Sequence, residues 1–137
     1  MRKLCAILLT GMLAALLSAC SGNSADDAAR AEKYKAAVTS IPHVASVESS
    51  YKTNPGMGRS GHVYITADTS DHQELTALLK QAFPAIVKSA EGDPEVGLDI
   101  LVIPADGANG ISPDDLGYKG AGTLTSYRDF LKAHPVL

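Results

Sequence analysis

The chain has 137 residues, with 12 basic and 15 acidic side chains and a formal net charge of −3. This acidic balance argues against nucleic acid as a partner and against a large electrostatic contribution to binding anionic lipid. Two Phe, five Tyr and no Trp leave few rings for stacking on sugars or bases, and the length suits a single domain.

The first nineteen residues have the three parts of a secretory signal peptide. Arg2 and Lys3 are the positive part, residues 4–17 are an apolar run, and Ser18-Ala19 supplies small residues before a cut. Fourteen helical residues span about 21 Å, less than the roughly 30 Å hydrocarbon core of a bilayer. We therefore expect residues 1–19 to be a cleaved signal rather than a transmembrane helix.

Leu17-Ser18-Ala19-Cys20 ends this segment, and the pattern resembles the lipobox of bacterial lipoproteins at all four positions. The resemblance covers residues 1–20. It implies that Cys20 becomes the mature N-terminus, carrying a thioether-linked diacylglycerol and an N-linked acyl chain such as palmitate. Two or more acyl chains make such an anchor stable, at roughly 0.8 kcal/mol per buried CH₂.

The implied anchor gives an expected location in the cell envelope, with the domain outside the cytoplasm and a membrane as its first partner. Ser21 after the cysteine resembles the outer-membrane sorting pattern of Gram-negative lipoproteins, and cell membrane and outer membrane both stay open. Cys5, the other cysteine, lies in the removed segment, so the mature protein would have no free thiol and no disulfide.

Residues 20–27 are expected to be the lipidated N-terminus and a polar tether, and residues 28–137 a single α/β domain. A helix is predicted from Asp26 to Ser40, before Pro42. Its expected buried stripe is Ala31, Tyr34, Val38 and Ile41.

Two strands are predicted next, because apolar and polar residues alternate over 44–52 and again over 62–68. Asn54 to Gly61 is predicted to be a long, glycine-rich connection between them. The expected inward side chains are Ala45, Val47, Ser49 and Tyr51 in the first strand and Val63, Ile65 and Ala67 in the second.

Ser70, with Gln73 at the capping-box position, predicts the start of an amphipathic helix that Pro84 kinks or breaks. Val96 to Ile103 is predicted to be the most covered strand, since Asp99 is its one polar interruption. A short helical turn at 112–115 and a final helix over 123–133 complete the chain.

This order predicts an α+β fold, a small αββαβα domain with a three-stranded mixed sheet and helices mainly on one face. Residues 36–90, with the strand start Gly61-His62-Val63-Tyr64-Ile65, resemble a BON-type envelope domain. The family pattern has a tight glycine turn and a second glycine at the end of the strand, where this chain has a long connection and Ala67-Asp68.

The glycine-rich loop 54–61 superficially suggests phosphate binding. A phosphate loop opens onto a helix, however, whereas this loop joins two strands and lacks the lysine of the nucleotide-hydrolase version. A hairpin connection is the favoured interpretation, and an anion or ligand loop around Arg59 is the alternative.

No metal site and no cofactor are predicted. His62 and Asp68 stand six residues apart on one strand, roughly 20 Å, so they do not share an ion. Asp71 and His72 are adjacent at a helix start, where an acid is favoured by the helix dipole. Residues 106–110 lack the spacing of a calcium loop.

The outward side chains of the first two strands form the most distinctive candidate surface. Ser46, Glu48 and Ser50 would lie beside His62, Tyr64 and Thr66, making a flat polar sheet face. A solvated face, or one partly covered by the C-terminal helix, is one interpretation. A docking surface for an envelope partner, or a dimer contact through a strand edge, is the other. The candidate contact residues are Arg59, His62, Tyr64 and Glu48.

Two classes of function stay open. The leading hypothesis is a non-enzymatic, membrane-anchored lipoprotein module that binds an envelope protein or cell-wall partner, because no catalytic motif stands out in the sequence. The alternative is a small ligand-binding or hydrolytic envelope enzyme whose mouth is formed by the loops at 54–61 and 104–112. Oligomeric state is not indicated by the sequence.

Overall fold

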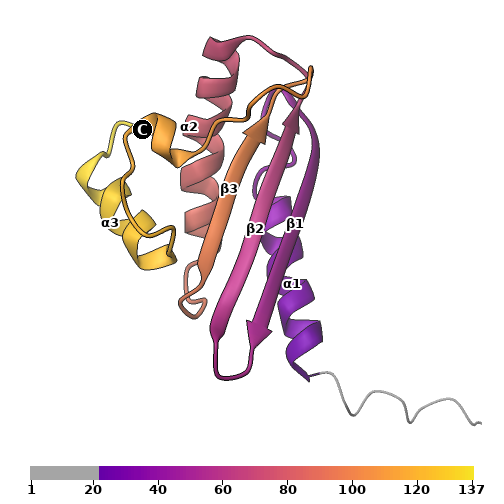
Figure 1. The fold of residues 1–137 in the computed structure, drawn as a ribbon, viewed down its shortest axis with the longest axis vertical. Helices are drawn as coiled ribbons and strands as arrows, with labels where there is room; N and C mark the ends of the chain where they lie inside the picture. Colours follow the sequence, from indigo (N-terminus) through magenta and orange to yellow (C-terminus); the bar gives the residue numbers. More distant parts are fainter. Residues whose placement is uncertain (1–21) are drawn as a thin grey trace, which may run out of the picture.

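The computed structural model describes residues 22–137, so the proposed signal and Cys20 lie outside the described residues. Figure 1 shows three helices and three strands. They are α1 (Gly22–Ala36), β1 (Val44–Asn54), β2 (Gly58–Ala67), α2 (His72–Ser89), β3 (Gly97–Ile103), the 3-10 turn η1 (Pro113–Leu116) and α3 (Leu124–Ala133). The prediction of an α+β fold with a three-stranded mixed sheet is confirmed.

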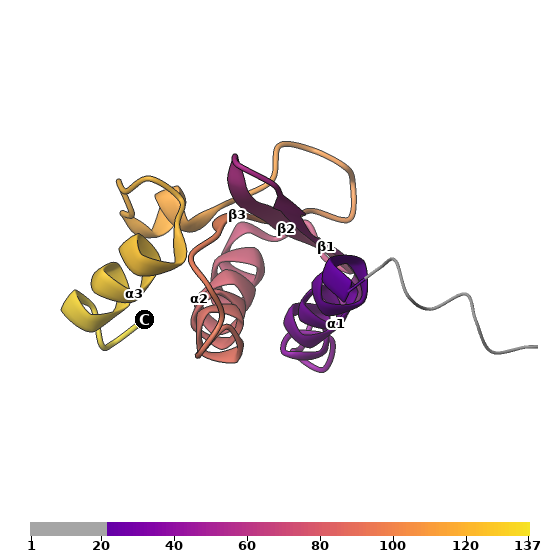
Figure 2. The ribbon, with the colours of Figure 1, turned by 90° about the horizontal axis from the view of Figure 1, so that it is seen from below.

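The sheet has the order β1-β2-β3, with β1 antiparallel to β2 and β2 parallel to β3. A parallel pair needs a crossover, and α2 supplies it. Figure 2 shows α1 and α2 beneath the sheet, with α3 beside α2 on the same side. The opposite side of the sheet, called here the outer face, carries none of the helices formed by residues 22–137.

The core lies between the sheet and the helices, and the alternation of the strands explains it. Val63, Ile65 and Ala67 of β2 are buried, as predicted, together with the alternate residues of β3. The apolar face predicted for α2 is buried along its whole length. Its members are Leu75, Leu78, Leu79, Ala82, Phe83, Ile86 and Val87.

The first helix begins and ends earlier than predicted, and it takes up most of the segment expected to be a tether. It begins at Gly22 rather than Asp26. Asp27, within the helix, accepts the backbone N–H of Thr53 at 2.7 Å and the Thr53 hydroxyl at 2.8 Å, and so ties the helix to β1. The helix ends at Ala36. Pro42 disfavours helical backbone only at the residue just before it, so the proline does not set this end.

The connection between the first two strands is a tight turn, and the prediction of a long loop over 54–61 is wrong. Met57 N–H donates to Asn54 O at 3.0 Å, and Gly56 has a φ of 75°. Proline followed by a positive-φ glycine is the pattern of a type II turn. The strands therefore pair as far as Asn54 and Gly58.

The crossover helix also differs from its prediction at two points. Its N-cap is Asp71, not Ser70: the Asp71 carboxylate accepts the N–H groups of Gln73 and Glu74, each at 3.0 Å. The helix also runs through Pro84 without the predicted break. Phe83 on one side of the proline and Ile86 on the other are fully buried, so packing against the sheet holds both halves in line.

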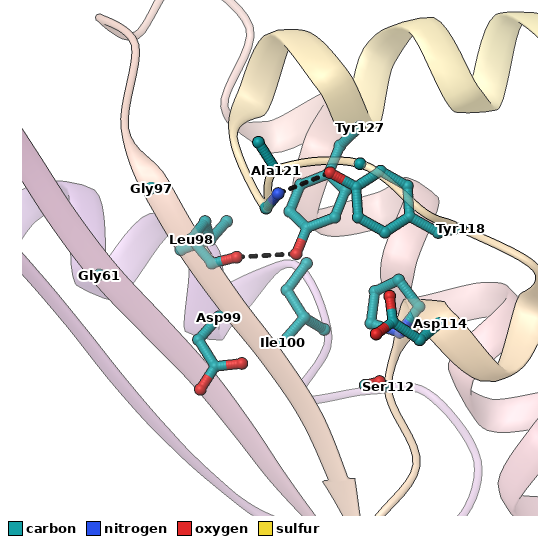
Figure 3. Close-up of a pocket in the computed structure, with 13 residues that line it drawn as sticks. Gly61, Gly97, Leu98, Asp99, Ile100, Ser112, Asp114, Tyr118, Ala121 and Tyr127 are labelled. Carbon is teal, nitrogen blue, oxygen red and sulfur yellow. Dashed lines mark hydrogen bonds between the residues drawn. The ribbon is translucent and has the colours of Figure 1, made fainter.

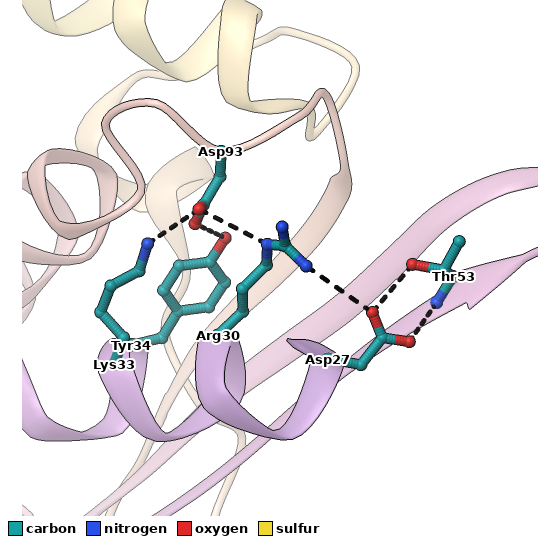
Figure 4. Close-up of polar contacts among 6 residues, drawn as sticks. All are labelled: Asp27, Arg30, Lys33, Tyr34, Thr53 and Asp93. Atoms are coloured by element: carbon teal, nitrogen blue, oxygen red, sulfur yellow. Dashed lines mark hydrogen bonds and ion pairs between the residues drawn. The ribbon is translucent and has the colours of Figure 1, made fainter. Parts of the chain in front are cut away.

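A polar cluster ties α1 to the turn before β3 (Figure 4). Asp93 accepts hydrogen bonds from Lys33 Nζ and Tyr34 Oη, both at 2.8 Å, and its Oδ1 lies 3.5 Å from Arg30 Nε. Tyr34 is fully buried, and its burial, followed by the hydrogen bond to Asp93, raises the pKa of the phenol. This cluster keeps α1 against the sheet, which leaves the outer face free.

Candidate functional site

The outer face gathers three of the four residues predicted as contacts. Glu48 pairs with Tyr64, and Ser50 pairs with His62, across β1 and β2. The His62 ring stacks on Tyr64, with ring centroids 4.3 Å apart and an interplanar angle of 17°. His62 Nδ1 lies 2.9 Å from Ser50 Oγ, and its Nε2 lies 3.3 Å from Glu48 Oε1. The contacts hold these side chains in one ordered group.

Asp99 of β3 completes this group, although it was not among the predicted site residues. Asp99 pairs with His62 in the parallel register, and Tyr64 Oη donates to Asp99 Oδ2 at 2.7 Å. That hydrogen bond is the main cause that raises the pKa of the Tyr64 phenol. The signal in the sequence was Asp99 itself, the single polar residue in an apolar strand.

Arg59 is not part of the outer face. It stands in β2 opposite Thr53, and alternation along the strand gives it the same side as the buried Val63 and Ile65. Its charge accordingly acts on Tyr51, which is buried on the helix side. Burial raises the pKa of Tyr51, and the charges of Arg30 and Arg59 oppose part of that rise.

The two loops named for an enzyme mouth lie at opposite ends of the sheet. Ser60 pairs with Gly97 at the start of the parallel ladder, close to the turn at 55–57. Thr66 pairs with Ile103 at the other end, where the 104–112 segment begins. The six-residue offset corresponds to roughly 20 Å, so the two segments do not form one mouth.

The 104–112 segment instead returns along β3. Ile111 forms an antiparallel bridge with Val102, and Gly110 comes so close to Leu101 that a Cβ at Gly110 would lie 2.9 Å from its Cδ1. Leu101 and Ile103 are half-buried on the outer face. Their apolar character, which predicted a covered strand, is explained in part by this return segment rather than by α3.

A pocket of about 450 Å³ opens beside β3, between the strand and the chain from η1 to α3 (Figure 3). Its wall includes the rings of Tyr118 and Tyr127, both held by hydrogen bonds. Tyr127 Oη donates to Leu98 O at 2.8 Å, and Tyr118 Oη accepts Gly122 N–H at 2.6 Å. Burial raises the pKa of Tyr127. Both hydroxyls are therefore hydrogen-bonded to the backbone, and these bonds fix the two rings in the wall of the pocket.

The charged residues that line this pocket are both acidic. Asp99 and Asp114 stand on either side of Ile100 in the view of Figure 3, and no lysine or arginine is among the lining residues described. Asp99 thus belongs both to the pocket and to the outer face. The two features meet at Asp99 but are otherwise lined by different side chains.

Metal ligands do not gather anywhere in residues 22–137: the structure shows no group of three His, Cys, Asp or Glu side chains able to hold an ion. Asp68, considered with His62 for zinc, instead accepts a hydrogen bond from His43 Nδ1 at 2.9 Å. That contact raises the pKa of His43.

From Gly22 to Leu137, none of the helices combines the length and the apolar content needed to span a bilayer.

No family model, no curated protein and no solved structure matches the chain.

Proposed function

We propose that the protein is a lipid-anchored binding module of the cell envelope and that its outer face docks a partner. The observation that carries the proposal is the ordered group of Glu48, His62, Tyr64 and Asp99 on the helix-free side of the sheet. Side chains already held in place lose little conformational entropy when a partner binds, which favours recognition.

The anchor part of the proposal rests on the lipobox-like sequence ending at Cys20. A diacylglycerol on Cys20 would be followed almost directly by α1, which begins at Gly22. Such a short connection would keep the domain close to the membrane surface. An envelope partner, protein or cell wall, would then meet the outer face at high effective concentration.

Thiol labelling tests the docking face, because a cysteine introduced there would be the only free thiol of a processed protein acylated at Cys20. Ser46→Cys places this thiol on the outer face and leaves Glu48 and His62 in place. We expect maleimide to label Ser46→Cys at least about fivefold more slowly in the native envelope than after purification, which corresponds to about 1 kcal/mol in favour of the partner-bound state. The matched control is Ala77→Cys on the exposed side of α2, whose labelling should not change. Protection should vanish when Cys20→Ala removes the anchor, in a variant that also carries Cys5→Ala so that no second thiol is present.

A cysteine on the outer face that is labelled at the same rate in the native envelope and after purification would contradict the docking face. Retention of labelled palmitate by the Cys20→Ala variant would contradict the anchor.

A hydrolase is the second candidate, and one observation favours it. Ser50, His62 and Glu48 stand in the order of a nucleophile, a base and an orienting acid, at 2.9 and 3.3 Å. Here the serine meets Nδ1 and the acid meets Nε2, and the Glu48 side chain is 77% exposed. Water competes for contacts on so open a face, so we favour binding over catalysis.

Ester hydrolysis separates the two classes. We expect p-nitrophenyl acetate to be hydrolysed no faster by the protein than by its Ser50→Ala variant, because a catalytic nucleophile needs oxyanion donors in a water-excluded site. His62→Ala serves as the control for simple imidazole catalysis. A loss of about 100-fold or more in Ser50→Ala, with the fold intact, would establish the hydrolase instead.

A further inference from the structure

The edge of β3 that faces away from β2 is covered only near its two ends. At one end Leu98 N–H donates to Gly122 O at 2.7 Å. At the other end Val102 and Ile111 exchange both backbone hydrogen bonds, at 2.8 and 2.9 Å. Two separate segments of the chain thus add short stretches of pairing to the same strand edge.

Ile100 lies between these two stretches, and its backbone polar groups face the uncovered part of the edge. Residues two apart in a strand direct their N–H and C=O groups to the same side, so Ile100 shares the direction of Leu98 and Val102. Among residues 22–137, no partner is found for the N–H and C=O of Ile100 on that side. The sheet therefore offers one donor and one acceptor, side by side.

The sequence of the flanking segments keeps this gap open. Pro113 follows Ile111 by two residues, at the position that would next pair with Ile100, but proline has no N–H to donate and here begins η1. At the other end Gly122 has a φ of 70°, outside the extended range of a strand, and the pairing of this segment runs from Leu98 toward Val96, not toward Ile100.

The gap opens into the pocket beside β3, since Ile100 is one of the lining residues. Asp99 and Asp114, the two charged lining residues, bring negative charge to the same space. A volume of about 450 Å³ falls in the range of small-molecule and short-peptide sites. The pocket thus combines strand-edge hydrogen bonding with a negative potential.

We propose that this pocket binds a short peptide segment carrying an ammonium group. One residue of the peptide would donate its N–H to Ile100 C=O and accept the Ile100 N–H through its own C=O, as in strand addition. The ammonium group would lie near Asp99 and Asp114. This site goes beyond the proposed docking of the outer face, with which it shares only Asp99.

NMR tests the proposal. The isotopically labelled protein, without the signal segment 1–19, is titrated with acetyl-Ala-Lys-Ala-amide. We expect the Ile100 amide resonance to shift and saturate at millimolar peptide. Replacing the lysine with norleucine should weaken binding about tenfold, since both charge contacts are lost. Methylating the peptide nitrogens should abolish the Ile100 shift, because it removes the donors.

Charge variants locate the ammonium group. Asp99→Asn and Asp114→Asn should each weaken binding about three- to fivefold while the remaining spectrum stays folded. Asp106→Asn, an exposed acid outside the pocket, is the control and should leave the affinity unchanged.

An Ile100 resonance that stays in place at millimolar peptide, or an equal loss in Asp106→Asn, would overturn the site. The titration uses purified protein and a defined peptide. Failure of outer-face protection in the envelope would therefore leave its result intact, and the two proposals can fail separately.

Discussion

Phe83→Ala is expected to lower the free energy of unfolding by about 3–5 kcal/mol, the largest effect of any substitution considered. Phe83 is fully buried, and its ring meets Tyr127 edge-on at a centroid distance of 5.0 Å and Phe130 at 6.1 Å. It therefore joins α2 to α3, and the cavity left by alanine would lie between them. Urea denaturation followed by circular dichroism measures the loss.

Two companion variants calibrate that result. Phe83→Leu keeps most of the apolar surface and should cost clearly less than Phe83→Ala. Ala77→Ser on the exposed side of α2 should change stability by no more than about 0.5 kcal/mol. If Phe83→Ala cost less than Phe83→Leu, or no more than the surface variant, the packing of α3 against α2 would be wrong, and with it the wall of the pocket.

Stability is expected to fall steeply as the pH rises above about 10. Burial raises the pKa of Tyr34, with a further contribution from Asp93, and burial raises the pKa of Tyr127. Both phenols therefore keep their protons in the folded state after unfolded tyrosines, with a pKa near 10, have begun to lose theirs. The stabilisation is complete below pH 10 and is lost progressively above it.

Each group contributes about 1.4 kcal/mol per pH unit above 10, so the two together predict a loss of about 3 kcal/mol by pH 11. Urea denaturation at a series of pH values measures this slope. Tyr34→Phe should remove about half of it, whatever its effect at neutral pH. Tyr64→Phe, whose phenol is half-exposed, should change it less. A slope unaltered by Tyr34→Phe would contradict the placement of Tyr34 in the core.

The fold was predictable where one hydrophobic periodicity, that of a strand or that of a helix, dominates a segment. The alternation over β2 predicted the burial of Val63, Ile65 and Ala67, and the helical spacing from Leu75 onward predicted the face of α2. The ends were less predictable because side chains act outside their own element. Asp27 of α1 bonds across to Thr53 of β1, and no local pattern contains that contact.

The outer face was predictable from the same alternation, but the pocket was not. Asp99 could have been placed beside His62 if β2 and β3 had been paired in register. The apolar neighbours of Asp99 pointed instead to a strand covered on both sides. The pocket depends on how β3, η1 and the segment before α3 meet. That arrangement follows from tertiary packing, through Tyr118 and Tyr127, rather than from local sequence.

Arg59 shows how one boundary changes the interpretation of a residue. Placed in a long loop, it was a free cation and a candidate ligand contact. Once β2 begins at Gly58, alternation sends Arg59 to the helix side, away from His62 and Tyr64. A proline and a positive-φ glycine tighten the turn. Arg59 therefore lies within β2, on the helix side of the sheet, and not in a loop.

The outer face is expected to meet a partner in the envelope, and photo-cross-linking from a benzoyl-phenylalanine at Tyr64 tests this in cells that make the lipidated protein. We predict one discrete adduct from this position, lost when Glu48→Lys reverses the charge beside it, and none from the same group placed at Ala77 on α2. Equal adducts from Tyr64 and Ala77, or none from Tyr64, would contradict the proposed docking face.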